Sequence, residues 1–380
     1  MSESLLLPSL KIRNYRVFDD LEVSTLGRVN LIVGQNNVGK TSLLEAVWLW
    51  ASRGDYKTIE NLVFQRDGAS VVTQQMEFPV SREDRLFFHK TIGMFLGISS
   101  LFYGFPAVAQ ERPPFVISSS DVKLTVKYQI SKNHLPHRND CEIFEFDFLP
   151  TLLVSFDDME IYQTHVGTNG RMKILCSLNN EKSFQVSKFR IPAIHFLSAS
   201  NPSFFSSMKR LWDRSLLNGR IDDILTGIKT IDSNIHEIFF INDDFPDNSV
   251  AICRHSEFSR PIPLRSLGDG VVWFFHIMLT LVNADNGILL IDEFENGLHY
   301  RIQPKAWEVI FHMAEQLNVQ VFATTHSADA VRSFEQVAMQ QDNENAGVVV
   351  QLAKLSKGII ANPLFGEDIR LMYQCKEDLR

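Results

Sequence analysis

The stretch VNLIVGQNNVGKTSLLEAVWLWAS, residues 29–52, decides the fold. Its centre, GQNNVGKT, fits the pattern G-x-x-x-x-G-K-[ST], in which backbone N–H groups wrap around phosphates. In that pattern the lysine, here Lys40, reaches the β and γ oxygens, and the hydroxyl of Thr41 ligates Mg²⁺. An apolar run precedes the loop and apolar side chains at helical spacing follow it. Strand, glycine-rich loop and helix together predict a phosphate-binding loop rather than a chance glycine turn.

Two details of this stretch bear on whether the loop can form. Asn37 occupies a slot where glycine is frequent, and asparagine is the side chain that best tolerates a left-handed backbone. Gly54 stands just after the helical stretch as a stop signal. Neither detail prevents the loop.

A second segment, ILLIDE at Ile288–Glu293, is an apolar strand that ends in two carboxylates. Such a pair can hold the water shell of Mg²⁺ and polarise an attacking water, although acids also end many buried strands at a surface. A third segment, VQVFA at 319–323, runs into Thr324, Thr325 and His326. Ligands collect at the carboxyl ends of parallel strands, so we expect His326 to sense phosphate rather than to serve only as a structural hydrogen-bonding group.

The segment SLGDG at Ser266–Gly270 lies just ahead of the apolar helical stretch 271–283. A serine and two glycines at a helix N-terminus make a second candidate anion site. A glycine turn that caps a buried helix is the alternative.

The order of these segments resembles a known family. Phosphate loop, SLGDG, ILLIDEFENGLH and ATTHS follow the Walker A, signature, Walker B, D-loop and switch-histidine order of ABC-type ATPases. The chain is most similar to the branch that includes RecF, SMC proteins and the overcoming-lysogenization-defect (OLD) nucleases, and within it to stand-alone heads. The resemblance is specific over residues 10–52 and 261–333. It implies an α/β P-loop NTPase fold of ABC type, with a mixed central sheet, an antiparallel β lobe and a helical lobe.

The resemblance also implies a role for each matching residue. Asp292 would hold Mg²⁺ through water together with Thr41, Glu293 would be the general base, and His326 would contact the γ-phosphate. ATP would be the bound nucleotide. The residues that would bind its triphosphate are Gly34, Gln35, Asn36, Asn37, Val38, Gly39, Lys40, Thr41 and Ser42.

The family works as two heads that sandwich two nucleotides. Ser266, Gly268 and Gly270 of one subunit would complete the site of the other, and residues 295–298 would line the dimer seam. Asp269 departs from the usual signature, because a small neutral residue is common there and a carboxylate would repel a γ-phosphate unless it turned away. The family's glutamine loop stays unassigned, with Gln65 and Gln110 as candidates.

Composition limits the alternatives. The chain has 380 residues, is 45% hydrophobic and carries a net charge of −8, so it can bury a large core, and any DNA-binding surface must be local. That counts against a general DNA-coating protein. The candidate basic patches, each of which can also be a solvated face, are Lys11, Arg13 and Arg16; Lys182, Lys188 and Arg190; and Lys209, Arg210 and Arg214.

Cysteine usage and hydropathy predict a cytoplasmic protein without zinc or a membrane span. The four cysteines are scattered without C-x-x-C spacing, which is typical of a reducing compartment. They are Cys141, Cys176, Cys253 and Cys375. The N-terminus shows no signal-peptide pattern. Residues 91–110 contain no charged side chain, but three glycines and Pro106 favour a buried helix and loop over a membrane span.

We divide the chain into four parts: 1–54, the N-terminal β lobe and phosphate loop; 55–200, an inserted region and antiparallel β lobe; 201–248, a helical lobe; and 249–380, the remaining half of the ATPase core. Alternation over 115–186, with Asn169-Gly170 between two runs, predicts antiparallel hairpins. Residues 202–240 are expected to be helical, in helices too short for a coiled-coil arm. We also expect a helix at 303–317 and a hairpin at 347–360.

The sequence shows no second catalytic centre. The stretch after His326, residues 327–380, is expected to be too short for the TOPRIM nuclease domain of OLD proteins. Our hypothesis is an ATPase that forms a homodimer or higher homo-oligomer, as the resemblance implies. Its ATP-driven dimerisation would control a separate effector, a TOPRIM-type nuclease of anti-phage defence. A DNA repair or recombination ATPase and a slowly hydrolysing scaffold are the alternatives. The trigger, the effector's identity and the choice of ATP over GTP stay open.

Overall fold

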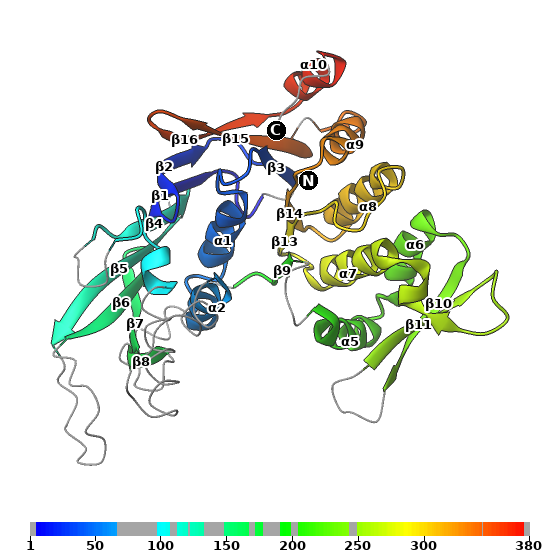
Figure 1. The fold of residues 1–380 in the computed structure, drawn as a ribbon, viewed down its shortest axis with the longest axis horizontal. Helices are drawn as coiled ribbons and strands as arrows, with labels where there is room; N and C mark the ends of the chain where they lie inside the picture. The colour runs from blue at the N-terminus through cyan, green and yellow to red at the C-terminus, as the bar shows by residue number, and fades with distance from the viewer. Residues whose placement is uncertain are drawn as a thin grey trace, which may run out of the picture.

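The computed structural model describes residues 5–66, 97–106, 112–120, 122–132, 148–166, 172–177, 191–198, 204–242, 249–343 and 345–375. Their strands form a six-stranded, a seven-stranded and a three-stranded sheet. Figure 1 shows the seven-stranded sheet on one side of helix α1 and a group of helices on the other side of the central strands. This arrangement confirms the predicted α/β class with a mixed central sheet, an antiparallel lobe and a helical lobe.

The six-stranded central sheet positions the candidate site. Its order is β16-β15-β3-β14-β13-β9, and every pairing is parallel except that of β15 with β16. The strands are β3 (Val29–Gly34), β9 (Ile194–Ser198), β13 (Ile288–Asp292), β14 (Gln320–Thr324), β15 (Gly347–Leu355) and β16 (Gly358–Leu364). The predicted C-terminal hairpin is thus confirmed, and its first strand extends the central sheet beside β3.

Alternate side chains of the central strands enter two separate cores. In β13, Leu289 and Ile291 belong to the core on the helical face, whereas Ile288 and Leu290 belong to the core on the face of α1. β14 behaves alike, since Phe322 lies on the α1 side. Because both faces are covered, the strands read as continuous apolar runs rather than as alternating patterns.

Helices cover both faces. On the helical side lie α5 (Phe204–Leu217), α6 (Ile221–Ile231), α7 (Asp269–Asn283), α8 (Gln303–Gln316), α9 (Ala328–Ala338) and, after β16, α10 (Glu367–Cys375). α1 (Lys40–Ala51) and α2 (Tyr56–Arg66) lie on the side of the antiparallel sheet. Gly54, at φ +68°, donates its N–H to Leu49 O and ends α1 as predicted.

The seven-stranded sheet is antiparallel throughout, in the order β2-β1-β4-β5-β6-β7-β8. Its strands are β1 (Leu10–Tyr15), β2 (Phe18–Val23), β4 (Phe115–Ser119), β5 (Val122–Lys132), β6 (Phe148–Phe156), β7 (Met159–Val166) and β8 (Met172–Ser177). The predicted β7–β8 hairpin is confirmed by the pairing of Val166 with Met172, while its Asn169-Gly170 turn lies outside the described residues.

The expectation of helix up to residue 240 is wrong at its end. Residues 235–242 form β10 (Ile235–Asn242), which pairs with β11 (Ser249–His255), and β11 pairs with the short β12 (Ile262–Pro263). The sequence IHEIFFIN is rich in β-branched and aromatic residues, and Ile238 and Phe240 pack toward the helices. This preference overrides the helical pattern that precedes it.

The first basic patch is also corrected. Arg16 is 2% exposed and forms an ion pair with the buried Glu45, 2.6 Å away, so it belongs to no surface. Lys11 and Arg13 are exposed but paired with acids across the β1–β2 hairpin. The patch at Lys182, Lys188 and Arg190 lies outside the described residues.

Within the described part of the chain, no helix is long and apolar enough to cross a membrane. Of residues 91–110, the described stretch is 97–106, in which 97–100 are helical. Cys253 is a buried free thiol, and the described residues contain no cluster of three metal-ligating side chains. The side chains of the other three cysteines fall outside the description.

Candidate functional site

The candidate site lies where three neighbouring strands end. β3, β14 and β13 are adjacent and parallel, so the loop after β3, the turn after β13 and the segment after β14 emerge at the same edge of the sheet. Three segments far apart in the sequence therefore meet: 34–42, 292–295 and 324–327.

The glycines of the phosphate loop are required by their surroundings. A Cβ on Gly34 would lie 2.4 Å from Leu352 O, and one on Gly39 would lie 2.7 Å from Phe18 Cζ, each closer than any real contact. Both residues have positive φ, of 142° and 92°. Asn37 is left-handed at φ 63°, as its side chain permits. The loop therefore forms with asparagine in the glycine slot.

Lys40 is folded back onto the loop. It is 5% exposed, and its Nζ donates to Gly34 O at 2.6 Å and to Gln35 O at 2.9 Å. Burial lowers the pKa of Lys40, and the charges of Glu295, Asp292 and Glu293 oppose that shift, Glu295 most. The ammonium thus lies at the start of α1, where the charges of three carboxylates act on it.

The N-terminus of α1 has no competing group. Its N-cap, Gly39, supplies no side-chain hydrogen bond, and the first turn carries no acidic residue. The first N–H groups of the helix and its dipole can therefore receive an anion. Gln35, Asn36 and Asn37 are exposed around this point, whereas Val38 and Ser42 are buried beneath it.

Asp292 and Thr41 provide a set of oxygen donors. Thr41 Oγ1 lies 3.3 Å from each carboxylate oxygen of Asp292. Thr324 fixes the carboxylate by donating from its own hydroxyl to Asp292 Oδ1 at 2.6 Å. Hydroxyl and carboxylate oxygens at this spacing, beside a phosphate loop, fit the hard ligands that Mg²⁺ prefers.

Glu293 has an unusual backbone. Its φ of 58° is left-handed, a conformation that costs about 1–3 kcal/mol for a residue of this kind and persists only where the surroundings impose it. Thr324 helps to impose it, because its hydroxyl accepts the N–H of Glu293 at 2.9 Å. The result is an exposed carboxylate beside the buried end of β13.

The segment that carries His326 is held by Glu295. Oε1 of Glu295 accepts the backbone N–H of His326 at 2.7 Å, and its Oε2 accepts the Thr325 hydroxyl at 2.8 Å. The His326 side chain is exposed at the same edge. Sequence reasoning placed Glu295 only at a dimer seam and gave no part to Thr324. The sequence did contain a signal for both roles, namely an acid two positions after Glu293 and two threonines directly before His326.

The SLGDG segment stands apart. Ser266 lies in a 3₁₀ turn, η1 (Leu264–Leu267), and both Ser266 and Gly268 are exposed ahead of α7. Within the described residues, no hydrogen bond or ion pair joins them to the phosphate loop. Asp269 forms an ion pair with Arg265 at 3.3 Å, so its negative charge has a partner within the same segment. Glycine is required at position 270 by packing, because a Cβ there would lie 2.3 Å from Gly297 O.

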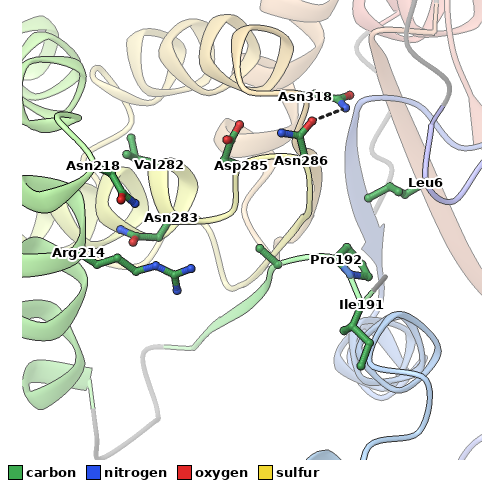
Figure 2. A pocket seen from close by; sticks show the side chains of 11 residues that line it. Leu6, Ile191, Pro192, Arg214, Asn218, Val282, Asn283, Asp285, Asn286 and Asn318 are labelled. Carbon is green, nitrogen blue, oxygen red and sulfur yellow. Dashed lines mark hydrogen bonds between the residues drawn. The ribbon is translucent and has the colours of Figure 1, made fainter. Parts of the chain in front are cut away.

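A pocket of about 900 Å³ lies elsewhere in the chain and is shown in Figure 2. Ala193, Asn286 and Asn318, which line it, lie one or two residues before the starts of β9, β13 and β14 respectively. The pocket therefore sits at the amino ends of the strands, opposite the edge where the phosphate loop and the acids meet, and it is not the nucleotide site. Arg214 of the third basic patch also lines it. Lys209 of that patch is ion-paired with Asp213.

Comparison with known proteins fits this geometry. The model of a family described as "AAA domain, putative AbiEii toxin, Type IV TA system" matches residues 29–332. The chain belongs to this AAA family. It is therefore an ATPase, and the order of its phosphate loop, acidic turn and histidine segment along the chain is similar to that of ABC-type ATPase heads.

Individual relatives of this AAA ATPase differ in how much they share. An "ATP/GTP phosphatase" of Helicobacter pylori is 20% identical over 98% of this chain and 100% of its own length. A "DNA replication and repair protein RecF" of Bacillus cytotoxicus is 35% identical over 54 residues, 14% of each chain. Among solved structures, an SMC head bound to the C-winged helix domain of ScpA aligns with a TM-score of 0.48 at 12% identity over 95% of this chain and 98% of that one. The SMC head domain of Thermotoga maritima aligns with a TM-score of 0.41 at 10% identity over 94% of this chain and 98% of that one.

Proposed function

We propose that this ATPase works as a dimer of heads, in which each nucleotide is held between the phosphate loop of one copy and the SLGDG segment of the other. The observation that carries the proposal is the division of the site. Loop, acids and His326 meet at one edge of the sheet, while Ser266 and Gly268 are exposed on the separate approach to α7. A second copy supplies what one chain leaves open.

Within this proposal each residue has one task. Lys40 turns from the two loop carbonyls to the β and γ oxygens of ATP, a charge-assisted contact that replaces its present hydrogen bonds. Glu293 takes a proton from the attacking water, and His326 contacts the γ-phosphate. Ser266, Gly268 and the N–H of Gly270 meet the phosphates of the partner's nucleotide.

Thr41 and Asp292 are the residues that would hold Mg²⁺. When bound, the ion neutralises charge that develops on the phosphate oxygens. Thr324 orients Asp292 for this through its short hydrogen bond.

We further propose that closure of the dimer controls a separate effector protein, a TOPRIM-type nuclease in defence against phage. The AbiEii description of the family, which names a toxin system, is consistent with such a partner. The RecF relative suggests DNA as an alternative target, but the loss of Arg16 from the first basic patch and the pairing of Lys11, Arg13 and Lys209 weaken that case.

Glu293→Gln tests the proposal. An isosteric amide cannot accept the proton from water, so hydrolysis should fall at least about 100-fold while ATP-bound dimers accumulate, seen by light scattering. Glu308→Gln, at an exposed glutamate of α8, is the matched control. Monomers at saturating ATP would contradict the two-head site. Co-purification with the products of neighbouring genes then tests the effector, and a consistently solitary dimer would exclude it.

A further inference from the structure

The carboxylate of Glu295 bridges the turn after β13 and the turn after β14. One oxygen accepts the backbone N–H of His326 at 2.7 Å, and the other accepts the hydroxyl of Thr325 at 2.8 Å. Hydrogen bonds to an ionised carboxylate are roughly twice as strong as neutral ones. The two contacts therefore fix the backbone on which the exposed His326 stands.

The same network continues on both sides of Glu295. Thr325 Oγ1 also accepts the N–H of Ser327 at 3.0 Å, and Ser327 caps α9 through the N–H of Ala330 at 3.3 Å. On the other side, Phe294 N donates to Thr324 O at 3.0 Å. The end of β14 and the start of α9 are thereby fastened to the acid-bearing turn.

His326 depends on this fastening. Its imidazole is exposed, so packing does not hold it in place. A ring that must meet a γ-phosphate needs a fixed backbone, because a misplacement of about 1 Å can cost about 100-fold in rate.

Glu295 is unsuited to being the base itself. Both of its oxygens already accept hydrogen bonds from the chain, whereas Glu293 lies exposed with a constrained backbone. Its charge also reaches Lys40, so it lies close to the phosphate-binding groups without being one of them.

We propose that Glu295 is a positioning residue of the hydrolytic site: it holds the backbone of His326 at the angle from which the imidazole meets the γ-phosphate. This rests on the role proposed above for His326. Glu295 acts through that histidine and exchanges no proton with the substrate.

A double-mutant cycle tests the proposal. Glu295→Ala should lower kcat about 10- to 100-fold, as expected for losing hydrogen bonds to a charged group, and leave the dissociation constant for ATP within about threefold. If Glu295 acts through His326, the double variant Glu295→Ala/His326→Ala is no slower than His326→Ala alone. If the kcat losses of the two single variants multiply in the double variant, the proposal is overturned.

Glu295→Gln supplies the conservative variant. Its amide oxygen can still accept the N–H of His326, so hydrolysis should recover to within about fivefold of the wild type. A glutamine variant as slow as the alanine variant would show that the charge acts on the reacting groups directly, and positioning would be excluded.

Amide hydrogen exchange without nucleotide gives a readout independent of hydrolysis. Exchange at His326 should be slow in the wild type and in Glu308→Ala, and at least about tenfold faster in Glu295→Ala. Unchanged exchange would overturn the positioning contact even if kcat fell. Wild-type hydrolysis by His326→Ala would instead contradict the role given to His326 under the proposed function, while exchange still decides whether Glu295 holds the segment.

Discussion

Lys40 occupies a position that packing alone would not give to a lysine. Lys40 is 5% exposed, and within the described part of the chain its Nζ donates hydrogen bonds only to two backbone carbonyls of the loop it belongs to. Burial lowers the pKa of Lys40, which means that keeping the cation there destabilises the folded chain. The negative charge of a bound triphosphate would offset that destabilisation.

Lys40→Ala should weaken ATP binding about 10- to 100-fold, because the charge-assisted contacts to the phosphates are lost. Isothermal titration calorimetry measures this directly. Lys57→Ala, at an exposed lysine of α2, is the control and should bind ATP as the wild type does. Equal affinity in both variants would remove the phosphate loop from nucleotide binding.

Glu335 on α9 makes stability depend on pH. Burial raises the pKa of this carboxyl from 4.5 to about 7, and the charge of Arg332 partly offsets the shift. Between these two values the folded chain keeps a proton that the unfolded chain has lost, so stability falls as the pH rises from about 4.5 to about 7.

Glu335→Gln should therefore be more stable than the wild type at pH 8, by about 1–3 kcal/mol, with the difference vanishing near pH 4.5. Urea unfolding at the two pH values measures the change. Glu308→Gln, at an exposed position, should show no such trend. A gain for Glu335→Gln that is independent of pH would mean that its carboxyl does not titrate as described.

Local chemistry made some residues predictable. Asn37 was expected to tolerate a left-handed backbone and does so, and Gly54 ends α1. The buried pair of Arg16 and Glu45 was not foreseeable, because nothing near Arg16 in the sequence shows that Glu45, on α1, faces it. The bridge from Glu295 to His326 depends likewise on two strand ends that meet only in the folded sheet.

Helix α7 is fixed to the turn that follows β13. Gly270 packs directly against the backbone of Gly297, and the indole of Trp273 donates to Phe294 O at 2.9 Å. The SLGDG segment at the start of α7 is thus packed against the turn that carries Glu293 and Glu295. Movement of one would be transmitted to the other.

Trp273→Phe should lower the free energy of unfolding by about 1–3 kcal/mol more than Trp307→Phe does. Both changes remove the same ring atoms from the core, but in the described residues the Trp307 indole N–H has no hydrogen-bond partner, so only Trp273→Phe leaves a buried carbonyl unpaired. Chemical denaturation of the two variants measures the difference. Equal losses would show that the contact between α7 and the turn contributes nothing.

Helices and strands were predictable where a single spacing of apolar residues, helical or alternating, ran through the whole element. The strands that flank the phosphate loop and the acids, and the helices after them, appear as expected. β9 was not anticipated, because its five residues become a strand only by pairing with β13. From the sequence, the residues of β10 were assigned to the end of a helical region, because β10 becomes a strand by pairing with β11, which begins only at Ser249. Short strands that depend on distant partners carry little signal of their own.

Under the proposed function, a single copy of the chain would present two half-sites. One gathers phosphate loop, acids and His326 at the carboxyl edge of the central sheet, and the other exposes Ser266 and Gly268 ahead of α7. In the dimer that we propose, two-fold pairing would join each half to its complement and make two equal sites. ATP binding and assembly would then be one equilibrium, through which an effector could be controlled.

Mixing two inactive variants tests this most directly. Lys40→Ala spoils the loop half of a site and Ser266→Arg the other half, so each variant alone should hydrolyse ATP at less than about 5% of the wild-type rate. In a mixed dimer both faults fall in one site and the second is intact, so an equal mixture should recover about one quarter of wild-type activity. A mixture no more active than its components, or full activity in Ser266→Arg alone, would contradict a site shared between two heads.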